Sequence, residues 1–358
     1  MSKNILIVDE LCYPMLGGQQ VHLQSLAEGW VKLGHKVSIV AIDHVGNLPD
    51  KEIVNGVLIN RLYHDSGYYK GGRFGRKLST ILWYTLKLGS FYKKEYDYVV
   101  FNQFPILPVI FYKLFYKKRS KTVLDFVEYR SGAFWKFIQL ILFNSTDIVV
   151  CISNYVQSMV LTQREKGIFA VPSFIDMGKA KSIRREYILF IGRFEEHKHP
   201  DHAIEAVLAY NKVNLKPKEL HLIGDGALLK MLMEKYSTEN LIIFHGRASD
   251  EKKTEILSKS RILILPSERE GLPVVIVEAL AYGIPTITTE YKDNGAQYFV
   301  KDNGIGLVAS PVVSDIANKI QIMENEYELF VEKCNTQKWN YDSKYCCEKY
   351  YSILEGIV

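Results

Sequence analysis

The sequence predicts an α/β protein with two doubly wound domains, each built on a parallel sheet. The chain of 358 residues is longer than a single hydrophobic core usually supports, and its length suits two domains. Short apolar runs alternate with stretches of helical periodicity, as in parallel α/β folds. A polar segment without periodicity at 173–186 separates two such series, so we expect domains at 1–172 and 187–341. A helix at about 342–358 could return to the first domain, and the two sheets should face each other across a cleft, a usual place for ligands.

In the first half, buried strands are expected at Ile5–Asp9, Val37–Ile42, Val54–Leu62, Tyr98–Phe101, Val123–Phe126, Asp147–Ile152 and Phe169–Val171. Helices are expected at 21–33, within 63–94 after a Gly- and Tyr-rich loop, at about 106–116 and, capped by Ser153, at 154–165. Gly17 and Gly18 occupy the turn between the first strand and first helix, at the sheet edge where nucleotides and phosphates bind. No third glycine completes a dinucleotide fingerprint, so a tight turn without a ligand is the alternative.

In the second half, strands are expected at 187–191, 220–223, 241–244, 262–265, 286–289 and 305–308, with helices between them, for instance at 203–210, 227–236 and 251–258. Three of these strands lead into Gly192, Gly224 and Gly246, and a fourth leads to Glu270-Gly271. Because the carboxyl ends of parallel strands share one edge, these glycines predict a place where backbone approaches a ligand closely.

Two cations follow the first strand of this second series. Arg193 and Lys198 are five residues apart, and a bidentate guanidinium beside an ammonium suits a diphosphate. Ordinary surface charge is the alternative reading of this pair taken alone.

Two carboxylates flank a predicted helix start. Pro273 suits the first turn of a helix and Gly283 its end, so Glu270 should lie on the entering loop and Glu278 inside the helix. The free N–H groups at such a start attract anions. A sugar phosphate would satisfy both features, because amides bind phosphate while carboxylates accept bonds from hydroxyls.

Several functional classes find no support in the sequence. It contains no Asp-x-Asp, P-loop, Gly-x-Ser-x-Gly or histidine cluster with ligand spacing, so we expect no metal and no cofactor. No apolar run approaches the ~18 residues of a membrane span, and the first residues enter a strand pattern, so we expect a cytoplasmic protein. The five cysteines have no paired spacing and are expected to be reduced thiols.

The charge of the chain is uneven. Residues 1–180 contain 22 Lys and Arg against 14 Asp and Glu, a net +8, whereas residues 181–358 have a net −3. Basic residues mix with aromatic ones at 68–77 and 111–121. Solvated helix faces are one interpretation, and contact with an anionic membrane surface or an anionic acceptor is the other. No motif for binding nucleic acid frames the charge, so nucleic acid is not an expected partner.

These motifs resemble the retaining GT-B glycosyltransferases of group 1, many of which act in bacterial glycan and lipid-glycan assembly. Glu270 and Glu278 match the Glu-x7-Glu pattern of that family, and Gly192, Arg193 and Lys198 match its Gly-Arg-x4-Lys pattern. The resemblance covers nearly the whole chain and is strongest from 192 to 285. It implies a GT-B fold and transfer of a hexose, with retention and without a metal, from a nucleotide diphosphate sugar, most often a UDP sugar. The acceptor would be a glycan or a lipid-linked glycan.

The resemblance also implies roles for individual residues. Arg193 and Lys198 would hold the diphosphate and stabilise the leaving group, and Glu270 would contact the donor sugar. The remaining donor-binding positions are Glu278 at the ribose, Gly271 and Leu272 near the sugar, Gly246 and Arg247 near the base, and Gly17, Gly18 and Gly192 near the phosphates.

The sequence departs from the family pattern in the first half. Many relatives have a histidine where the strand 122–126 ends, and here Asp125 or Glu128 lies near that place. We therefore expect Asp125 to take part in catalysis, with a structural role at the strand end as the alternative. Gln19 and Gln20 also stand where relatives often have an acidic residue. The other functions to consider are a non-catalytic glycan-binding or chaperone subunit of the same shape and a sugar-nucleotide epimerase.

Overall fold

The computed structural model describes residues 2–14, 18–68, 76–116, 120–180 and 185–357. Its contacts divide the chain into two units, Met1–Pro172 with Ser343–Val358, and Ser173–Asp342. The first unit therefore includes the C-terminal helix. The segment expected to be a linker is partly packed, because Ser173 and Phe174 are buried in the second unit and Ile175 pairs with Asp342.

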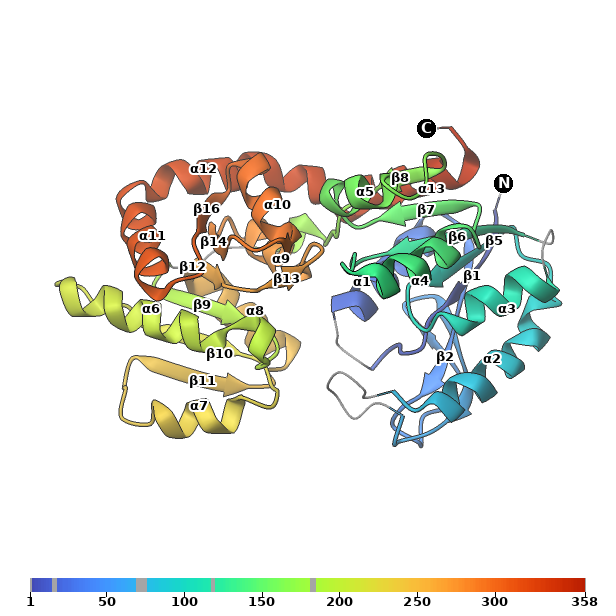
Figure 1. Cartoon of the computed structure of the whole chain (residues 1–358), viewed down its shortest axis with the longest axis horizontal. Coiled ribbons are helices and arrows are strands. Elements are labelled where there is room, and N and C mark those ends of the chain that lie inside the picture. The colour runs from blue at the N-terminus through green and yellow to red at the C-terminus, as the bar shows by residue number, and fades with distance from the viewer. Residues whose placement is uncertain (1, 15–17, 69–75, 117–119, 181–184, 358) are drawn as a thin grey trace. The chain divides into compact units, whose positions relative to one another are not determined.

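The first unit contains an eight-stranded sheet in the order β3-β4-β2-β1-β5-β6-β7-β8 (Figure 1). Its strands are β1 (Asn4–Val8), β2 (Lys36–Asp43), β3 (Lys51–Val54), β4 (Val57–His64), β5 (Tyr98–Asn102), β6 (Lys121–Phe126), β7 (Ile148–Cys151) and β8 (Ile168–Ala170). Its helices are α1 (Gly18–Lys32), α2 (Leu78–Tyr92), α3 (Leu107–Phe115), α4 (Ala133–Phe143), α5 (Asn154–Leu161) and α13 (Ser343–Glu355). The neighbouring strands are parallel except β3 and β4, which confirms the predicted α/β class.

One predicted strand is wrong. The run 54–62 was expected to form a single strand, but β3 and β4 form an antiparallel hairpin through Asn55 and Gly56. Both turn residues have positive φ, 50° and 85°, as a two-residue type I′ turn requires. The Asn-Gly pair was a sequence signal for this turn.

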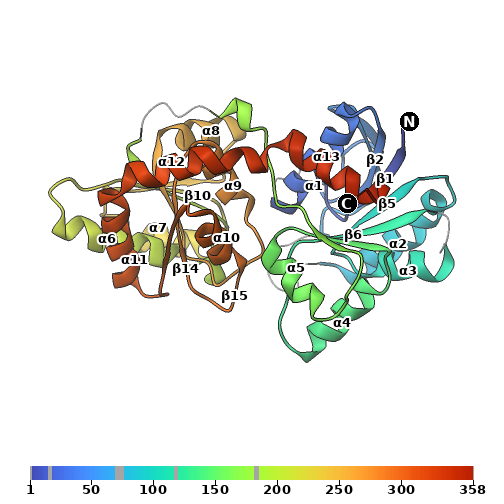
Figure 2. The ribbon, with the colours of Figure 1, turned by 90° about the horizontal axis from the view of Figure 1, so that it is seen from above.

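The helices of the first unit cover both faces of its sheet. Figure 2 shows α1 and α13 on one side of the strands and α2, α3 and α4 on the other. This follows from right-handed crossovers, because the chain moves from β1 to β2 in one direction and from β4 through β5 to β8 in the opposite one. Trp30 of α1 and Tyr350 of α13 pack edge to face with ring centres 5.3 Å apart.

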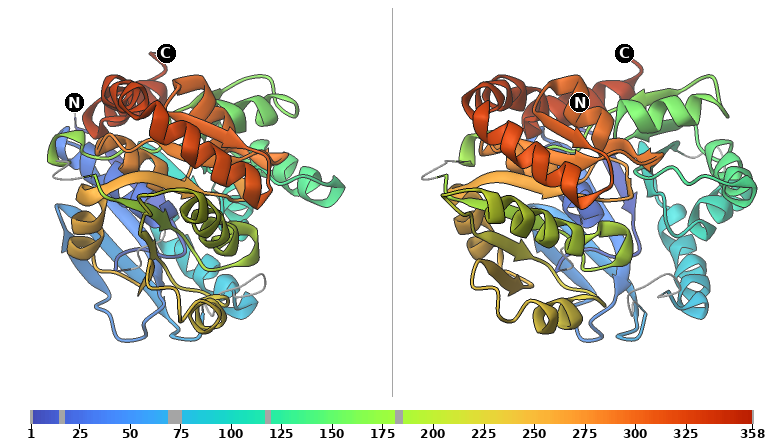
Figure 3. Two further views of the ribbon diagram at one scale, coloured as in Figure 1. Left: turned by 90° about the vertical axis from the view of Figure 1, so that its left-hand side faces the viewer. Right: turned by 60° about the vertical axis from the view of Figure 1, so that its left-hand side comes forward.

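The second unit contains a six-stranded parallel sheet in the order β11-β10-β9-β12-β14-β16. Its strands are β9 (Tyr187–Ile191), β10 (Leu220–Ile223), β11 (Ile242–Gly246), β12 (Ser260–Leu265), β14 (Thr286–Thr289) and β16 (Gly306–Ala309), with a small separate ladder of β13 (Arg269–Glu270) and β15 (Asp293–Asn294). Its helices are α6 (Pro200–Val213), α7 (Leu229–Lys235), α8 (Asp250–Lys259), α9 (Val274–Ala281), α10 (Gly295–Asn303), α11 (Val313–Asn325) and α12 (Tyr327–Gln337). Figure 3 shows the yellow-green α6 packed beside the orange-red α11.

A hydrophobic core of the second unit is formed by alternate strand residues, which share one face of this sheet, including Phe190 and Ile264, packed with Phe194 and with residues of α6 and α11. All five cysteines of the chain are buried. Within the described ranges, no helix has the length and apolar character needed to cross a bilayer.

Candidate functional site

The glycine-rich strand ends of the second unit lie together at one edge of its sheet. The Gly192 N–H donates to the carbonyl of Ile223 at 3.0 Å, and the Gly224 N–H donates to the carbonyl of Gly246 at 2.9 Å. A Cβ on Gly224 would lie 1.8 Å from the Gly192 carbonyl oxygen. These loops therefore pack backbone against backbone, which requires glycine at position 224.

The loop after β9 brings a cation to a carboxylate. The backbone N–H of Glu268 donates to the carbonyl of His197 at 2.8 Å and so joins this loop to the chain after β12. As a result, the Lys198 ammonium contacts the carboxylate of Glu270, and both side chains are mostly buried. The two residues are 72 positions apart in the sequence, and the fold brings their side chains into contact.

The second predicted cation has a partner nearer in sequence. The Arg193 guanidinium donates to Glu195 at 3.0 Å and is about half exposed, with 54% of its side chain accessible. Glu195 was not singled out from the sequence. It positions a guanidinium that remains open to solvent and hence to an anion.

The electrostatics of His197 show that both cations act on one place. Burial, followed by the charges of Lys198 and Arg193, lowers the pKa of His197 to about 3. His197 is therefore neutral at physiological pH and adds no charge to this loop. The two cations near the end of a parallel strand can attract a ligand with negative charge.

The second carboxylate of the predicted pair lies on α9. Pro273 is the N-cap of this helix and not its first helical residue, and Gly283, with φ of 67°, ends it as expected. The Glu278 carboxylate accepts a hydrogen bond from the Lys253 ammonium of α8 at 2.9 Å. Lys253 was missed at the sequence level, because nothing in the local pattern of α8 indicates that it faces α9.

The other positions predicted in the second unit are distributed around this edge. Gly271 and Leu272 follow Glu270 directly and are buried, and the Leu272 carbonyl accepts a bond from Ser173 at 3.4 Å. Gly246 ends β11, with Arg247 exposed beside it. Their roles at the sugar and the base stay predictions.

In the first unit, Gly17 lies outside the described residues, and Gly18 is the first residue of α1. The next residue, Gln19, donates to the side chain of Asn102. Asn102 donates in turn to Asp9 at 2.5 Å, just beyond β1. Burial raises the pKa of Asp9 to about 7. This polar chain fixes the start of α1 against the sheet edge, while the predicted contact of both glycines with phosphate stays untested.

Asp125 does not have the surroundings expected of a catalytic residue. Its side chain is 2% exposed, and its Oδ2 accepts a hydrogen bond from the Tyr350 hydroxyl of α13 at 3.1 Å. Nε2 of His22 lies 3.4 Å from the same oxygen. Asp125 therefore joins α1, β6 and α13, and the structural alternative fits this geometry better. The sequence could not show this, because Tyr350 is 225 positions away.

No group of three or more His, Cys, Asp or Glu side chains suited to a metal ion occurs in the part of the chain that the structure describes. The prediction that the reaction needs no metal remains to be tested by experiment.

Comparison with known proteins identifies relatives along most of the chain. Residues 175–338 match the family model "Glycosyl transferases group 1", and residues 16–179 match "Glycosyltransferase Family 4". A Campylobacter jejuni undecaprenol-linked alpha-1,4-N-acetyl-D-galactosaminyltransferase is 30% identical over 43% of each chain. An Escherichia coli UDP-Gal:alpha-D-GlcNAc-diphosphoundecaprenol alpha-1,3-galactosyltransferase is 31% identical over 48% of this chain and 46% of that protein. The chain spans about half the length of most curated relatives it matches.

Solved structures extend the similarity to the whole fold. Sucrose-phosphate synthase from Thermosynechococcus elongatus has a TM-score of 0.79 at 16% identity, over 99% of each chain. Anabaena HepE in complex with UDP and glucose has a TM-score of 0.76 at 15% identity, also over 99% of each chain. At such identities the likeness concerns the fold alone, and that fold is GT-B. Two family models that overlap at 175–179 thus span residues 16–338, and both describe glycosyltransferases, with the group 1 model matching the second half of the chain.

Proposed function

We propose that this protein is a retaining, metal-independent glycosyltransferase that moves a hexose from a UDP sugar to a glycan or lipid-linked acceptor. The observation that carries the proposal is the contact of Lys198 with Glu270, with the half-exposed Arg193 on the same loop after β9. One carboxylate and two cations at a strand end match a ligand with a diphosphate at one end and hydroxyls at the other.

The proposed chemistry uses these groups in separate roles. Arg193 and Lys198 hold the diphosphate and stabilise the charge that grows on it as its bond to the anomeric carbon breaks. Glu270 accepts hydrogen bonds from hydroxyls of the transferred sugar. The acceptor oxygen forms its bond to the anomeric carbon on the face that the diphosphate leaves, and the acceptor proton passes to a diphosphate oxygen. The products are the glycoside and UDP, and no protein nucleophile is needed.

The names of related proteins support the donor class and the stereochemistry. One relative is named for UDP-Gal and for an alpha-1,3 linkage, and another for an alpha-1,4 linkage. Two structural neighbours, HepE and the pneumococcal O-GlcNAc transferase GtfA, were solved with UDP and a sugar. An alpha product from an alpha-linked UDP sugar corresponds to retention.

The test combines UDP calorimetry with a transfer assay on a donor screen. We expect Glu270→Ala to lower kcat at least a hundredfold, because it removes a sugar contact in the transition state. UDP binding should persist in this variant, since Glu270 contacts the sugar and its loss frees Lys198 from a carboxylate. Arg193→Ala should weaken UDP binding about tenfold or more, as the loss of a charged hydrogen bond does.

The matched control is Lys230→Ala with Glu234→Ala, which removes an exposed ion pair on α7 of the same unit. Its kinetics should equal those of the wild type. Unchanged turnover in both Glu270→Ala and Arg193→Ala would refute the site. Loss of activity in excess EDTA would refute metal independence, and a beta-linked product in the NMR spectrum would refute retention.

A further inference from the structure

Three helices on one face of the first unit expose apolar side chains to solvent. We define this apolar face by Leu78 and Trp83 of α2, Leu114 and Phe115 of α3, and Phe134 and Phe137 of α4, each of which is more than half exposed. The three helices lie on the same side of the sheet (Figure 2), as the crossover direction requires. A run of exposed aromatic and aliphatic side chains on adjacent helices is unusual for a surface that meets only water.

The apolar face rests on a well-packed support. A Cβ on Gly89 of α2 would lie 2.9 Å from the Tyr116 hydroxyl, so α2 and the end of α3 approach each other closely. Beneath them, the rings of Tyr92 and Tyr112 meet edge to face with centres 4.9 Å apart, and Tyr92 and Tyr116 do so at 5.4 Å. The exposed side chains are therefore presented by a packed layer and are not the result of a loosely folded segment.

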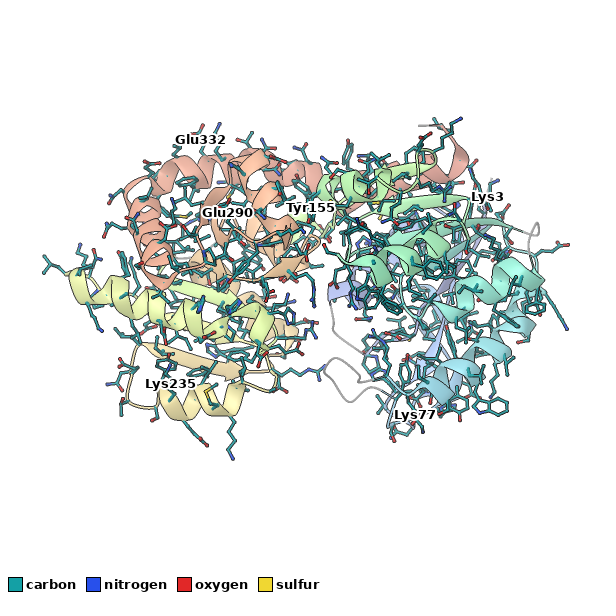
Figure 4. The ribbon with its side chains drawn as sticks, viewed as in Figure 1. Lys3, Lys77, Tyr155, Lys235, Glu290 and Glu332 are labelled. Carbon is teal, nitrogen blue, oxygen red and sulfur yellow. The ribbon has the colours of Figure 1, made fainter. Side chains whose placement is uncertain are left out.

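The charged side chains on the three helices all have one sign. None of α2, α3 and α4 contains Asp or Glu, and each contains one lysine: Lys87, Lys113 and Lys136. Further lysines stand at the two ends of α2. Lys77, labelled in Figure 4, precedes it and pairs with Asp65, and Lys93 and Lys94 follow it, just before Glu95. An occupant of this face must therefore accept both apolar insertion and positive charge.

A lipid surface fits this combination better than a protein does. Lysine is depleted from protein interfaces, whereas lysine side chains extend readily from an apolar face to the headgroups of a bilayer. Tryptophan and other aromatic rings are favoured at the same depth. Helices of this kind lie in the plane of the membrane, with the apolar side chains inserted by ~5–10 Å. We propose that α2, α3 and α4 form a docking surface for an anionic phospholipid bilayer.

The proposal is independent of the donor chemistry, and it extends the sequence expectation, which already included Leu114 and Phe115, to α2 and α4. That expectation rested on 68–77 and 111–121, where residues 69–75 and 117–119 are outside the described ranges. α4 had not been identified at all. This helix contributes Phe134 and Phe137 to the apolar face, with Lys136 between them.

The experiment is flotation of the full chain with two kinds of vesicle, phosphatidylcholine alone and phosphatidylcholine mixed with phosphatidylglycerol. We expect binding to the mixed vesicles and little binding to the neutral ones. The variant Trp83→Ala/Phe134→Ala/Phe137→Ala should lower the partition coefficient at least tenfold, because three exposed rings no longer insert. Lys87→Glu/Lys136→Glu should lower it severalfold for each lysine and only with the anionic lipid.

The matched control changes two exposed apolar residues of the second unit, Val213→Ser and Leu215→Ser, and should bind like the wild type. Because every altered side chain is exposed, circular dichroism and thermal unfolding should be unchanged. Failure of the wild type to float with either vesicle would overturn the proposal, as would equal binding by the triple ring variant. A dimer in light scattering that the triple ring variant dissolves, without vesicle binding, would assign the face to a second copy of this chain and so overturn it.

Discussion

Asp9 at the end of β1 provides a quantitative test of the structure. It is 2% exposed, and its carboxylate accepts bonds from the side chain of Asn102 and the backbone N–H of Glu10. The effect of burial exceeds that of these hydrogen bonds and raises the pKa of Asp9 from the ordinary 3.8 to about 7. Because one pKa unit corresponds to about 1.36 kcal/mol, ionised Asp9 lowers the free energy of unfolding by up to about 4 kcal/mol at and above neutral pH.

The sign of the effect follows from proton binding. Between pH 4 and 7 the folded protein holds the Asp9 proton, whereas the unfolded chain has released it, so stability falls as pH rises through this window. Asp9→Asn keeps the shape and the acceptor oxygen but cannot ionise. We expect it to match the wild type near pH 4 and to be more stable by roughly 2–4 kcal/mol at pH 8.

The assay is urea unfolding followed by tryptophan fluorescence in a Trp339→Phe background. Trp339 belongs to the second unit, and the other three tryptophans, at 30, 83 and 135, belong to the first. Emission then reports the unit that contains Asp9, which avoids mixing two transitions.

Asp43→Asn is the matched control with the opposite sign. Burial alone would raise the pKa of Asp43, but hydrogen bonds from the Gly46 N–H and from His64 outweigh it and hold the pKa below its ordinary value. Its substitution should therefore destabilise the first unit at neutral pH, with a difference that shrinks as pH falls toward the carboxylate range. A stability difference for Asp9→Asn that does not change between pH 5 and pH 8 would refute the reasoning.

Two other substitutions test contacts within the second unit. Lys253→Met should raise the KM for the donor about fivefold to tenfold with little change in kcat, because Glu278 loses a charged hydrogen bond that orients it. Lys253→Arg should recover part of this loss. A fall in kcat alone would contradict the assignment. Gly224→Ala should destabilise this unit by about 2–4 kcal/mol in calorimetry, since its Cβ would strike the Gly192 carbonyl. The control is Gly178→Ala, whose Cβ would make only ordinary van der Waals contact. Its stability should change by less than about 0.5 kcal/mol.

The strands that carry the site were predictable because their signal is local. An apolar run followed by glycine, as at Ile191-Gly192 and Ile223-Gly224, indicates both a buried strand and the close turn at its end. Both positions are strand ends in the structure. Parallel pairing then brings them to one edge of the sheet. This arrangement could be inferred from the alternation of strands and helices along the chain alone.

Two elements of the first unit escaped prediction for opposite reasons. The period-two pattern of 54–62 continues through Asn55-Gly56, so the turn was hidden by the strand signal around it. α4 has the sequence AFWKFIQLILF, in which all residues except Lys136 and Gln139 are apolar, and so apolar a run is hard to distinguish from a buried strand. The exposed aromatic rings of α4 also belong to the apolar face. The apolar composition that made this helix hard to predict is thus the property on which the proposed membrane contact depends.

The pairings within the site could not be predicted, because they depend on which loops the fold brings together. Three charged residues proposed to bind the donor have partners of opposite charge: Lys198 has Glu270, Arg193 has Glu195, and Glu278 has Lys253. Under the proposed function, a diphosphate bound to Lys198 would compete with Glu270 for the ammonium and so release the Glu270 carboxylate toward the sugar hydroxyls. Charge that is balanced within the protein costs less to bury than isolated charge. In that function the contact between Lys198 and Glu270 would couple diphosphate binding to sugar recognition, so we expect the effects of substituting the two residues on turnover to be non-additive.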